Sequence, residues 1–225
     1  MSSQASSQSP QKYPGHGHYI PFIVFVVLTW LPTIIPRTIL PGAGYIFYAA
    51  KTVITACLLW HFRKYYVELN FRFHWSAPLA GILVIIAWVG LDDSYPLLGM
   101  RVGFDPIQMS NHSLNILIVF FRLAGAVLVV PIMEELFFRS WMARWIIDPN
   151  FMRIPVGAFS WPSLVITTGL FALGHHEWLP GILAGLVFYG YVLWKKRLGD
   201  AIVAHAVANL ALGIYVLKTQ SWQFW

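Results

Sequence analysis

The sequence contains few charged residues and only one cysteine. Charged residues make up 11% of the chain and apolar residues 58%, whereas a soluble domain carries about 25% charged residues. A water-soluble globule of 225 residues could not bury so much apolar surface. Cys57 alone excludes an internal disulfide framework and any multi-cysteine metal site. The composition therefore indicates an integral membrane protein, and we predict no cofactor and no bound metal.

Apolar runs near the length of a membrane-spanning helix, about 20 residues, occur seven times. The third, fifth and sixth runs are short. We predict an all-α integral membrane protein, a polytopic bundle of about seven (six to eight) transmembrane helices with an intramembrane polar cavity. A polar tail, residues 1–18, precedes the runs and is expected to be flexible. The runs cover residues 19–35, 43–61, 76–91, 113–138, 163–176, 179–194 and 201–217.

The net charge of +6 is explained by where the cations lie relative to these runs. Most Lys and Arg residues lie in the N-terminal tail and in alternate loops, among them Arg63, Lys64 and Lys195. Cationic loops favour the cytoplasmic side of a membrane. We therefore predict a cytoplasmic N-terminus and, with seven spans, a C-terminus on the outer side. The lipid bilayer is the expected partner, and no nucleic acid is expected.

Three groups of polar side chains lie at membrane depth, where ionisable residues are costly and usually functional. In the first group, Glu135 and Arg139 are four residues apart, so they can pair along one face of a helix. Glu134 points toward another face and is left to seek a partner on a different helix. The group therefore contains one neutralised carboxylate and one available carboxylate.

The second and third groups supply imidazoles and hydrogen-bond donors. His205 and Asn209 are four residues apart, so they project from the same side of the last helix, where both can donate to an oxyanion. We expect His175 to reach Glu134 and to help it polarise a water. A carboxylate, an imidazole, a water and two neutral donors are sufficient for amide hydrolysis without a covalent intermediate.

Glu134 and His175 can meet only if their helices bring them to a similar depth in the membrane. The predicted spans place Glu134 toward the cytoplasmic end of the fourth helix and His175 toward the outer end of the fifth. Either the fourth helix continues to about Ile147, with Glu134 near mid-depth, or the fifth does not cross completely, and Pro131 permits a kink. We favour the longer fourth helix, with Glu134 and His175 facing a shared cavity.

Three motifs, Glu-Glu-x-x-x-Arg, Phe-x-x-x-His and His-x-x-x-Asn, lie in this order on separate apolar segments and resemble those of the CPBP family over roughly residues 113–213. This family consists of glutamic intramembrane endopeptidases, including the CAAX prenyl protease. The resemblance implies a membrane-associated protein or peptide as substrate. It also implies N-terminal transmembrane helices (19–112), a catalytic core (113–217) and a C-terminal tail (218–225). The implied roles are Glu134 as general base, His175 as the residue that positions the water, His205 and Asn209 as the oxyanion site, and Glu135 with Arg139 as support.

Outside the motifs, the chain resembles a bacterial branch of this family that is found with exosortase and PEP-CTERM surface-protein sorting systems. Three stretches carry this second resemblance: Glu-Glu-Leu-Phe-Phe-Arg-Ser-Trp, His-His-Glu-Trp-Leu-Pro-Gly-Ile-Leu-Ala-Gly-Leu and Ser-Trp-Gln-Phe-Trp. The resemblance implies a multi-pass protein of the bacterial inner membrane with a partner in an exosortase-type sorting system. The substrate of that branch does not follow from it.

Besides a proton-coupled transporter that uses Glu134 as a relay, which the missing internal repeat argues against, two other functions stay open from the residues themselves. A metal-dependent membrane protease is one, because two histidines and one glutamate form a plausible zinc set. The helical His-Glu-x-x-His signature is absent, however, since Pro180 stands four residues after His176. The other is a non-catalytic membrane partner, an immunity or assembly module of a sorting system, in which the polar side chains would hold helices together.

Overall fold

The apolar runs of the sequence form helices. The structure, a computed structural model, describes the whole chain except residues 1–14, 36–38, 40–42, 102, 104 and 107–111. Within the described residues there is no strand, and single turns of 3-10 helix occur at Arg63–Tyr65, Phe151–Arg153 and Trp222–Phe224. The α-helices are α1 (His16–Ile34), α2 (Ala43–Phe62), α3 (Ser76–Gly90), α4 (His112–Ala124), α5 (Val130–Glu134), α6 (Ala143–Trp145), α7 (Trp161–Leu173), α8 (Trp178–Lys195) and α9 (Gly199–Thr219).

Several of these helices are long and apolar enough to cross a membrane. The five segments that qualify by length and composition are His16–Ile34, Ala43–Tyr65, Ser113–Trp145, Trp178–Lys195 and Gly199–Thr219, and α3 and α7 are shorter apolar helices. The chain is therefore an all-helical, polytopic membrane protein, as predicted. The sixth apolar run was expected to be short, but it forms the 18 residues of α8.

Helices α4, α5 and α6 form one long rod of helical backbone. Two stretches of π-helix, η3 (Gly125–Val129) and η4 (Glu135–Met142), join them. The helical segment reaches Trp145, and the amide of Ile147 still bonds to the carbonyl of Arg144. The longer fourth helix expected from the sequence is thus confirmed. Glu134 lies inside it, where α5 meets η4.

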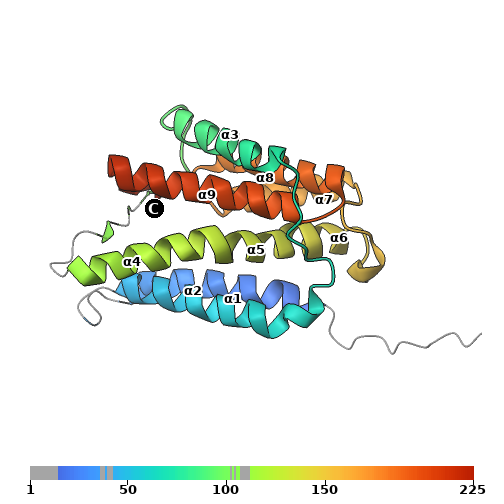
Figure 1. The fold of residues 1–225 in the computed structure, drawn as a ribbon, viewed down its shortest axis with the longest axis horizontal. Coiled ribbons are helices and arrows are strands. Elements are labelled where there is room, and N and C mark those ends of the chain that lie inside the picture. The colour runs from blue at the N-terminus through green and yellow to red at the C-terminus, as the bar shows by residue number, and fades with distance from the viewer. Residues whose placement is uncertain (1–14, 36–38, 40–42, 102, 104, 107–111) are drawn as a thin grey trace, which may run out of the picture.

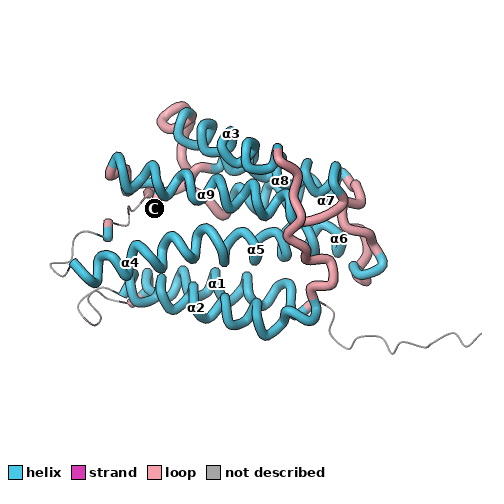
Figure 2. The backbone as a smooth tube through the Cα atoms, in the orientation of Figure 1, coloured by secondary structure: helices cyan, strands magenta, loops and turns pink. Residues whose placement is uncertain are grey.

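The long rod lies between two groups of helices. In Figure 1, α4, α5 and α6 run across the middle of the molecule, with α1 and α2 on one side and α3, α8 and α9 on the other. Helix α1 packs against α2, α3 against α9, and α7 against α8. Figure 2 shows that the loops lie at the ends of the helices and that the bundle between them is helical. The polar motifs therefore meet where the rod faces α9 and α7.

A glycine allows α3 to approach α9 closely. Gly81 is buried, and a Cβ atom at this position would overlap the backbone carbonyl oxygen of Ala204. His205 follows directly in the chain, and it is buried as well. The tight contact between these helices fixes the part of α9 that carries the His-x-x-x-Asn motif.

The N-terminal helix begins earlier than the sequence suggests. The predicted flexible tail ends at residue 18, whereas α1 starts at His16; residues 1–14 lie outside the described residues. His18 is buried, and its Nε2 lies 2.8 Å from Oε1 of Glu68. The hydroxyl of Tyr66 donates a hydrogen bond to the carbonyl of Gly17. These partners lie some fifty residues away in the chain, so local composition does not reveal them.

Candidate active site

The first motif forms the buried ion pair that its spacing predicts. Nε of Arg139 lies 3.3 Å from Oε2 of Glu135, and the two side chains are 1% and 0% exposed. The guanidinium also donates a hydrogen bond to the backbone carbonyl of Gly185 in α8 and lies over the ring of Phe171. A buried charge is strongly destabilising without a partner. The pair therefore links η4 to α7 and α8 beside the remaining motif residues.

His205 lies between the two glutamates. Its Nδ1 is 3.1 Å from Oε1 of Glu135, and its Nε2 is 3.9 Å from Oε2 of Glu134. The ring of Phe188 stacks on the imidazole, with 4.7 Å between centroids. Because a carboxylate only accepts hydrogen bonds, Nδ1 carries the proton that is donated to Glu135. In neutral His205, Nε2 then bears a lone pair. In protonated His205, Nε2 carries a hydrogen that faces Glu134.

The formal charges of this cluster depend on the protonation of His205. Glu134 and Glu135 bring two negative charges as carboxylates, and Arg139 brings one positive charge. With neutral His205 the sum is −1, and with protonated His205 it is zero. A low-dielectric interior favours the neutral sum. A proton on Nε2 of His205 or on the carboxyl of Glu134 would make the sum zero.

Asn209 is anchored to the long helix through a carbonyl that a proline leaves available. In the π-helical stretch η3, the amide of Val130 bonds to the carbonyl of Gly125, five residues back. The next donor in that register would belong to Pro131, which has no N–H and cannot bond to Ala126. The carbonyl of Ala126 instead accepts a hydrogen bond of 2.7 Å from Nδ2 of Asn209. One N–H of the carboxamide remains for another acceptor.

His175 follows the end of α7 and is held by its own helix. Its Nδ1 lies 2.8 Å from the carbonyl oxygen of Phe171, so Nδ1 carries the proton and Nε2 is a hydrogen-bond acceptor in the neutral ring. The imidazole packs edge-on against Trp88 of α3, with 5.2 Å between centroids. His175 therefore offers a fixed acceptor at the end of α7.

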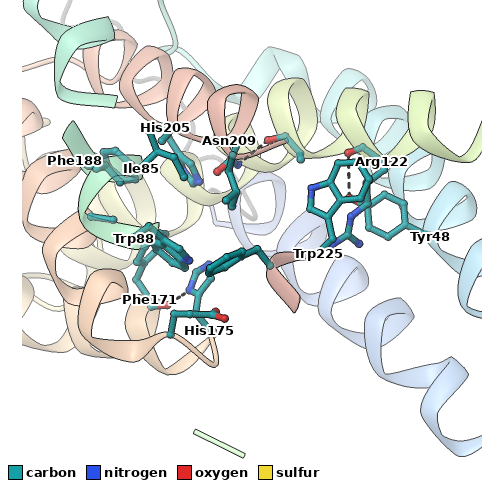
Figure 3. A pocket seen from close by; sticks show the side chains of 17 residues that line it. Tyr48, Ile85, Trp88, Arg122, Phe171, His175, Phe188, His205, Asn209 and Trp225 are labelled. Carbon is teal, nitrogen blue, oxygen red and sulfur yellow. Dashed lines mark hydrogen bonds between the residues drawn. The ribbon is translucent and has the colours of Figure 1, made fainter. Parts of the chain in front are cut away.

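Three of the predicted residues line one cavity of about 170 Å³. His175, His205 and Asn209 all contribute to its wall, together with Trp88 and Phe171 (Figure 3). The wall thus contains groups of the kind that hydrolysis uses: an acceptor for water and donors for an oxyanion. The other side chains that line the cavity include Tyr48, Arg122, Glu177, Phe188 and Trp225.

The contact that the structure gives Glu134 is with His205, and the expectation that Glu134 and His175 act on one water stays a prediction. We expected Glu134 and His175 to face the same cavity, but Glu134 is not part of the cavity lining. Within the described residues, the histidine whose ring lies within 4.0 Å of Glu134 is His205, and no ion pair joins Glu134 to His175. The packing of α5 against α9 brings Glu134 to His205, and His205 also lines the cavity. Oε2 of Glu134 is buried without a hydrogen-bond partner.

The segment that contains these motifs matches a protein family. Residues 116–211 match the model of the family described as type II CAAX prenyl endopeptidase Rce1-like. The match supports the CPBP family. It supports in general terms a CAAX-type intramembrane protease, and it contains all six predicted site residues. No curated protein and no solved structure matches the chain.

The cavity beside the CPBP-like motifs contains a charged residue, Arg122, for which the sequence predicts a structural or partner-facing role. Arg122 lies in α4, twelve residues before Glu134, and it lines the cavity wall. Its signal in the sequence is an arginine within an apolar run, and such residues are functional candidates by default. Trp225 also lines the cavity, but its place depends on how the chain folds back after α9. Among the described residues, no group of three or more His, Cys, Asp or Glu side chains is arranged to hold a metal ion.

Proposed function

We propose that the protein is a glutamic-type intramembrane endopeptidase that hydrolyses a peptide bond in a membrane-associated protein or peptide. One observation carries the proposal: His205 is held at Nδ1 by Glu135 and faces Glu134 with Nε2, beside a cavity that His175 and Asn209 also line. The family match over residues 116–211 supports the same reaction class.

Glu134 is the general base in this proposal. In the neutral form of the cluster with protonated His205, Glu134 is a carboxylate and can take a proton from water. Its Oε2 lies 3.9 Å from Nε2 of His205, a separation at which one water hydrogen-bonded to both atoms completes the contact. On the cavity side, Nε2 of His175 is the acceptor that we propose for water entering the site beside His205. Glu135 and Arg139 keep His205 in place.

The water oxygen attacks the carbonyl carbon of the substrate, a carbon–oxygen bond forms, and the carbonyl electrons move to the oxygen. The N–H of Asn209 that Ala126 does not use and Nε2–H of protonated His205 donate to this oxyanion. The carbon–nitrogen bond then breaks as the proton held by Glu134 passes to the leaving amine. One water is consumed, and the products are one carboxyl group and one amine. The reaction forms no covalent intermediate with the protein.

A comparison of peptide termini in membranes tests this function. Cells would express the wild-type protein, Glu134→Gln, or Asp93→Asn as a matched control in an exposed loop residue. We expect at least one new peptide terminus with wild type and with Asp93→Asn, and its absence with Glu134→Gln. Identical termini in all three samples would overturn the proposal. If Glu134→Gln also kept the cellular function and captured a stable partner, the protein would be a non-catalytic assembly or immunity module.

Metal content separates the proposal from a metal-dependent membrane protease. The expected result for purified active protein is no stoichiometric zinc and unchanged cleavage after treatment with a chelator. Zinc bound at one equivalent, with activity lost on its removal and restored on its return, would replace the glutamic mechanism.

We further propose that the protein lies in a bacterial inner membrane with its N-terminus in the cytoplasm and that it acts with an exosortase-type sorting system. The cationic tail and alternate loops support the orientation, and the stretches around Glu134 and His175 support the sorting system. Reporter fusions at residue 1 and after residue 225 test the orientation, which requires an active cytoplasmic reporter at residue 1. Co-purification with an exosortase-type protein, from native membranes of a cell that has such a sorting system, tests the partner. If the two proteins do not co-purify, the proposed partnership is wrong.

A further inference from the structure

We propose that Arg101 is a positioning residue, which holds the turn that carries His175 and so sets where this imidazole lies in the cavity. This inference rests on the proposed peptidase activity. His175 and Glu177 both line the cavity, whereas the described side chains of the cavity wall do not include that of Arg101. Arg101 precedes Glu177 by 76 residues, in the connection between α3 and α4. Its effect on the reaction would therefore pass through the turn.

The turn that carries His175 is short. Helix α7 ends at Leu173 and α8 begins at Trp178, so residues 174–177 alone join them. Nδ1 of His175 lies 2.8 Å from the carbonyl oxygen of Phe171, a contact that orients the ring relative to the end of α7. The residues that follow His175 find side-chain partners outside these two helices.

Hydrogen bonds fasten this turn to the connecting segment, residues 91–101. The backbone amide of Leu98 donates a hydrogen bond of 3.1 Å to the carbonyl of His176. In return, Nδ1–H of His176 donates to the carbonyl oxygen of Leu98 at 2.6 Å. The indole N–H of Trp178 donates to the carbonyl of Pro96 at 2.8 Å. All three bonds use the backbone of the connecting segment, so the turn is held only as firmly as the segment itself.

Arg101 closes the connecting segment on itself and on the turn. Its Nη1 lies 2.8 Å from Oδ1 of Asp92, near the start of the segment, and 3.3 Å from Oε1 of Glu177. The side chains of Arg101, Asp92 and Glu177 are only 12%, 16% and 10% exposed. Asp93 lies 3.9 Å from the guanidinium, but its side chain is 92% exposed, and such solvated pairs contribute little.

Loss of the guanidinium would leave two shielded carboxylates facing each other. Asp92 and Glu177 both contact the same nitrogen of Arg101, so without the cation they repel each other across about 6 Å at most. This repulsion pushes the turn away from the connecting segment and displaces His175. A misplacement of about 1 Å in a reacting group can lower a rate about 100-fold.

Steady-state kinetics in proteoliposomes, with the peptide that the terminus comparison identifies, tests this role. Arg101→Gln is expected to lower kcat about 10- to 100-fold with a KM near that of wild type. Arg101→Lys should retain most of kcat, because one ammonium has donors for both carboxylates. Arg153→Gln, at an exposed residue of the turn Phe151–Arg153, is the matched control and should behave as wild type. A change in KM alone in Arg101→Gln would overturn the inference.

A double-mutant cycle with His175 separates positioning from general damage. If Arg101 acts through His175, Arg101→Gln should change kcat by less than about twofold in a His175→Asn protein. The full loss in that background would overturn the inference. A His175→Asn protein that cleaves as fast as wild type would remove the role of His175 and this inference with it. Where His175→Asn leaves no measurable rate, hydrogen exchange decides.

Hydrogen exchange in nanodiscs tests the same link without a substrate. The amide of Leu98 is protected by the carbonyl of His176, so exchange in residues 91–101 reports the link directly. We expect exchange in residues 91–101 and 174–177 to be about tenfold faster in Arg101→Gln than in wild type or Arg153→Gln, with α9 unchanged. Wild-type exchange in both segments would overturn the inference. If Arg101→Gln does not fold, Glu177→Gln breaks the same link and is judged by the same two outcomes.

The failure of this inference is distinguishable from failure of the proposed function. Cleavage that persists in Glu134→Gln removes the proposed mechanism itself, whatever the exchange measurement shows. Cleavage that requires Glu134 and His175 but keeps the wild-type kcat in Arg101→Gln removes only the role of Arg101.

Discussion

The side-chain amide of Asn209 donates a hydrogen bond of 2.7 Å to the backbone carbonyl of Ala126, five residues before a proline. Pro131 has no N–H to give to this carbonyl in the π-helical register. The proline therefore makes a backbone acceptor available to α9, and the position of Asn209 depends on it. Pro131 thus influences the candidate site through the backbone of the long helix.

Replacing Pro131 tests this relationship. In Pro131→Ala the restored N–H can bond to the carbonyl oxygen of Ala126, where it competes with the side-chain amide of Asn209 and weakens that anchor. We expect kcat for peptide cleavage to fall about tenfold, roughly the effect of one hydrogen bond, with little change in KM. Pro32→Ala, in α1 far from the motif residues in the chain, is the control. An unchanged kcat in Pro131→Ala with a folded protein would mean that the anchor has no role in the reaction.

The Glu135–Arg139 pair is predicted to dominate the stability of the core. Removing one partner of a buried ion pair typically costs about 3–5 kcal/mol because the other charge stays buried. Arg139→Gln should lower the free energy of unfolding by that amount in detergent. The double variant Glu135→Gln/Arg139→Gln should be more stable than Arg139→Gln, since no isolated charge remains. Thermal unfolding followed by tryptophan fluorescence measures both, and a double variant less stable than either single one would contradict the pairing.

Glu68 is predicted to make the stability of the protein sensitive to acid. It lies in the loop after α2, where it contacts His18, Arg144 and the hydroxyl of Ser140. Burial tends to raise the pKa of the Glu68 carboxyl, but hydrogen bonds and charge from His18 and a hydrogen bond from Ser140 outweigh it and lower the pKa from 4.5 to about 2. The folded protein thus favours the ionised form more than the unfolded chain does.

The direction of the pH effect follows from this lowered pKa. The stabilisation is complete above pH 4.5 and is lost as the pH falls toward 2. The shift corresponds to about 3 kcal/mol, so Glu68→Gln should unfold at lower temperature than wild type at pH 7. The two unfolding temperatures should converge as the pH approaches 2. A constant difference between wild type and Glu68→Gln from pH 7 to pH 2.5 would show that ionisation of Glu68 does not stabilise the fold.

The sequence predicts those features that depend on neighbouring residues in one helix. Apolar runs near membrane length indicate the spanning helices, and a spacing of four residues indicates the pair of Glu135 with Arg139. The same spacing places His205 and Asn209 on one side of α9, and both line the cavity. Each of these inferences needs only helix geometry and hydrophobic length.

Relationships between helices are harder to predict from the sequence. Whether Glu134 meets His175 or His205 depends on how α9 is rotated against α5, and the contact of Gly81 with Ala204 sets the approach of α3 to the same helix. The π-helical stretches around Glu134 change the direction of the side chains that follow, and the spacing of apolar residues does not reveal them. The early start of α1 depends on the contact between His18, in the first turn of α1, and Glu68, in the loop after α2.

The most direct measurement compares cleavage by wild type, Glu134→Gln and Glu134→Asp in proteoliposomes, with the peptide that the terminus comparison identifies. Loss of a general base lowers a rate by about 10²- to 10⁴-fold. The account predicts a fall in kcat of this size for Glu134→Gln, a smaller fall for Glu134→Asp, and a KM close to that of wild type in both. A Glu134→Gln protein that cleaves the peptide within about twofold of the wild-type rate would contradict the assignment of Glu134 as the base.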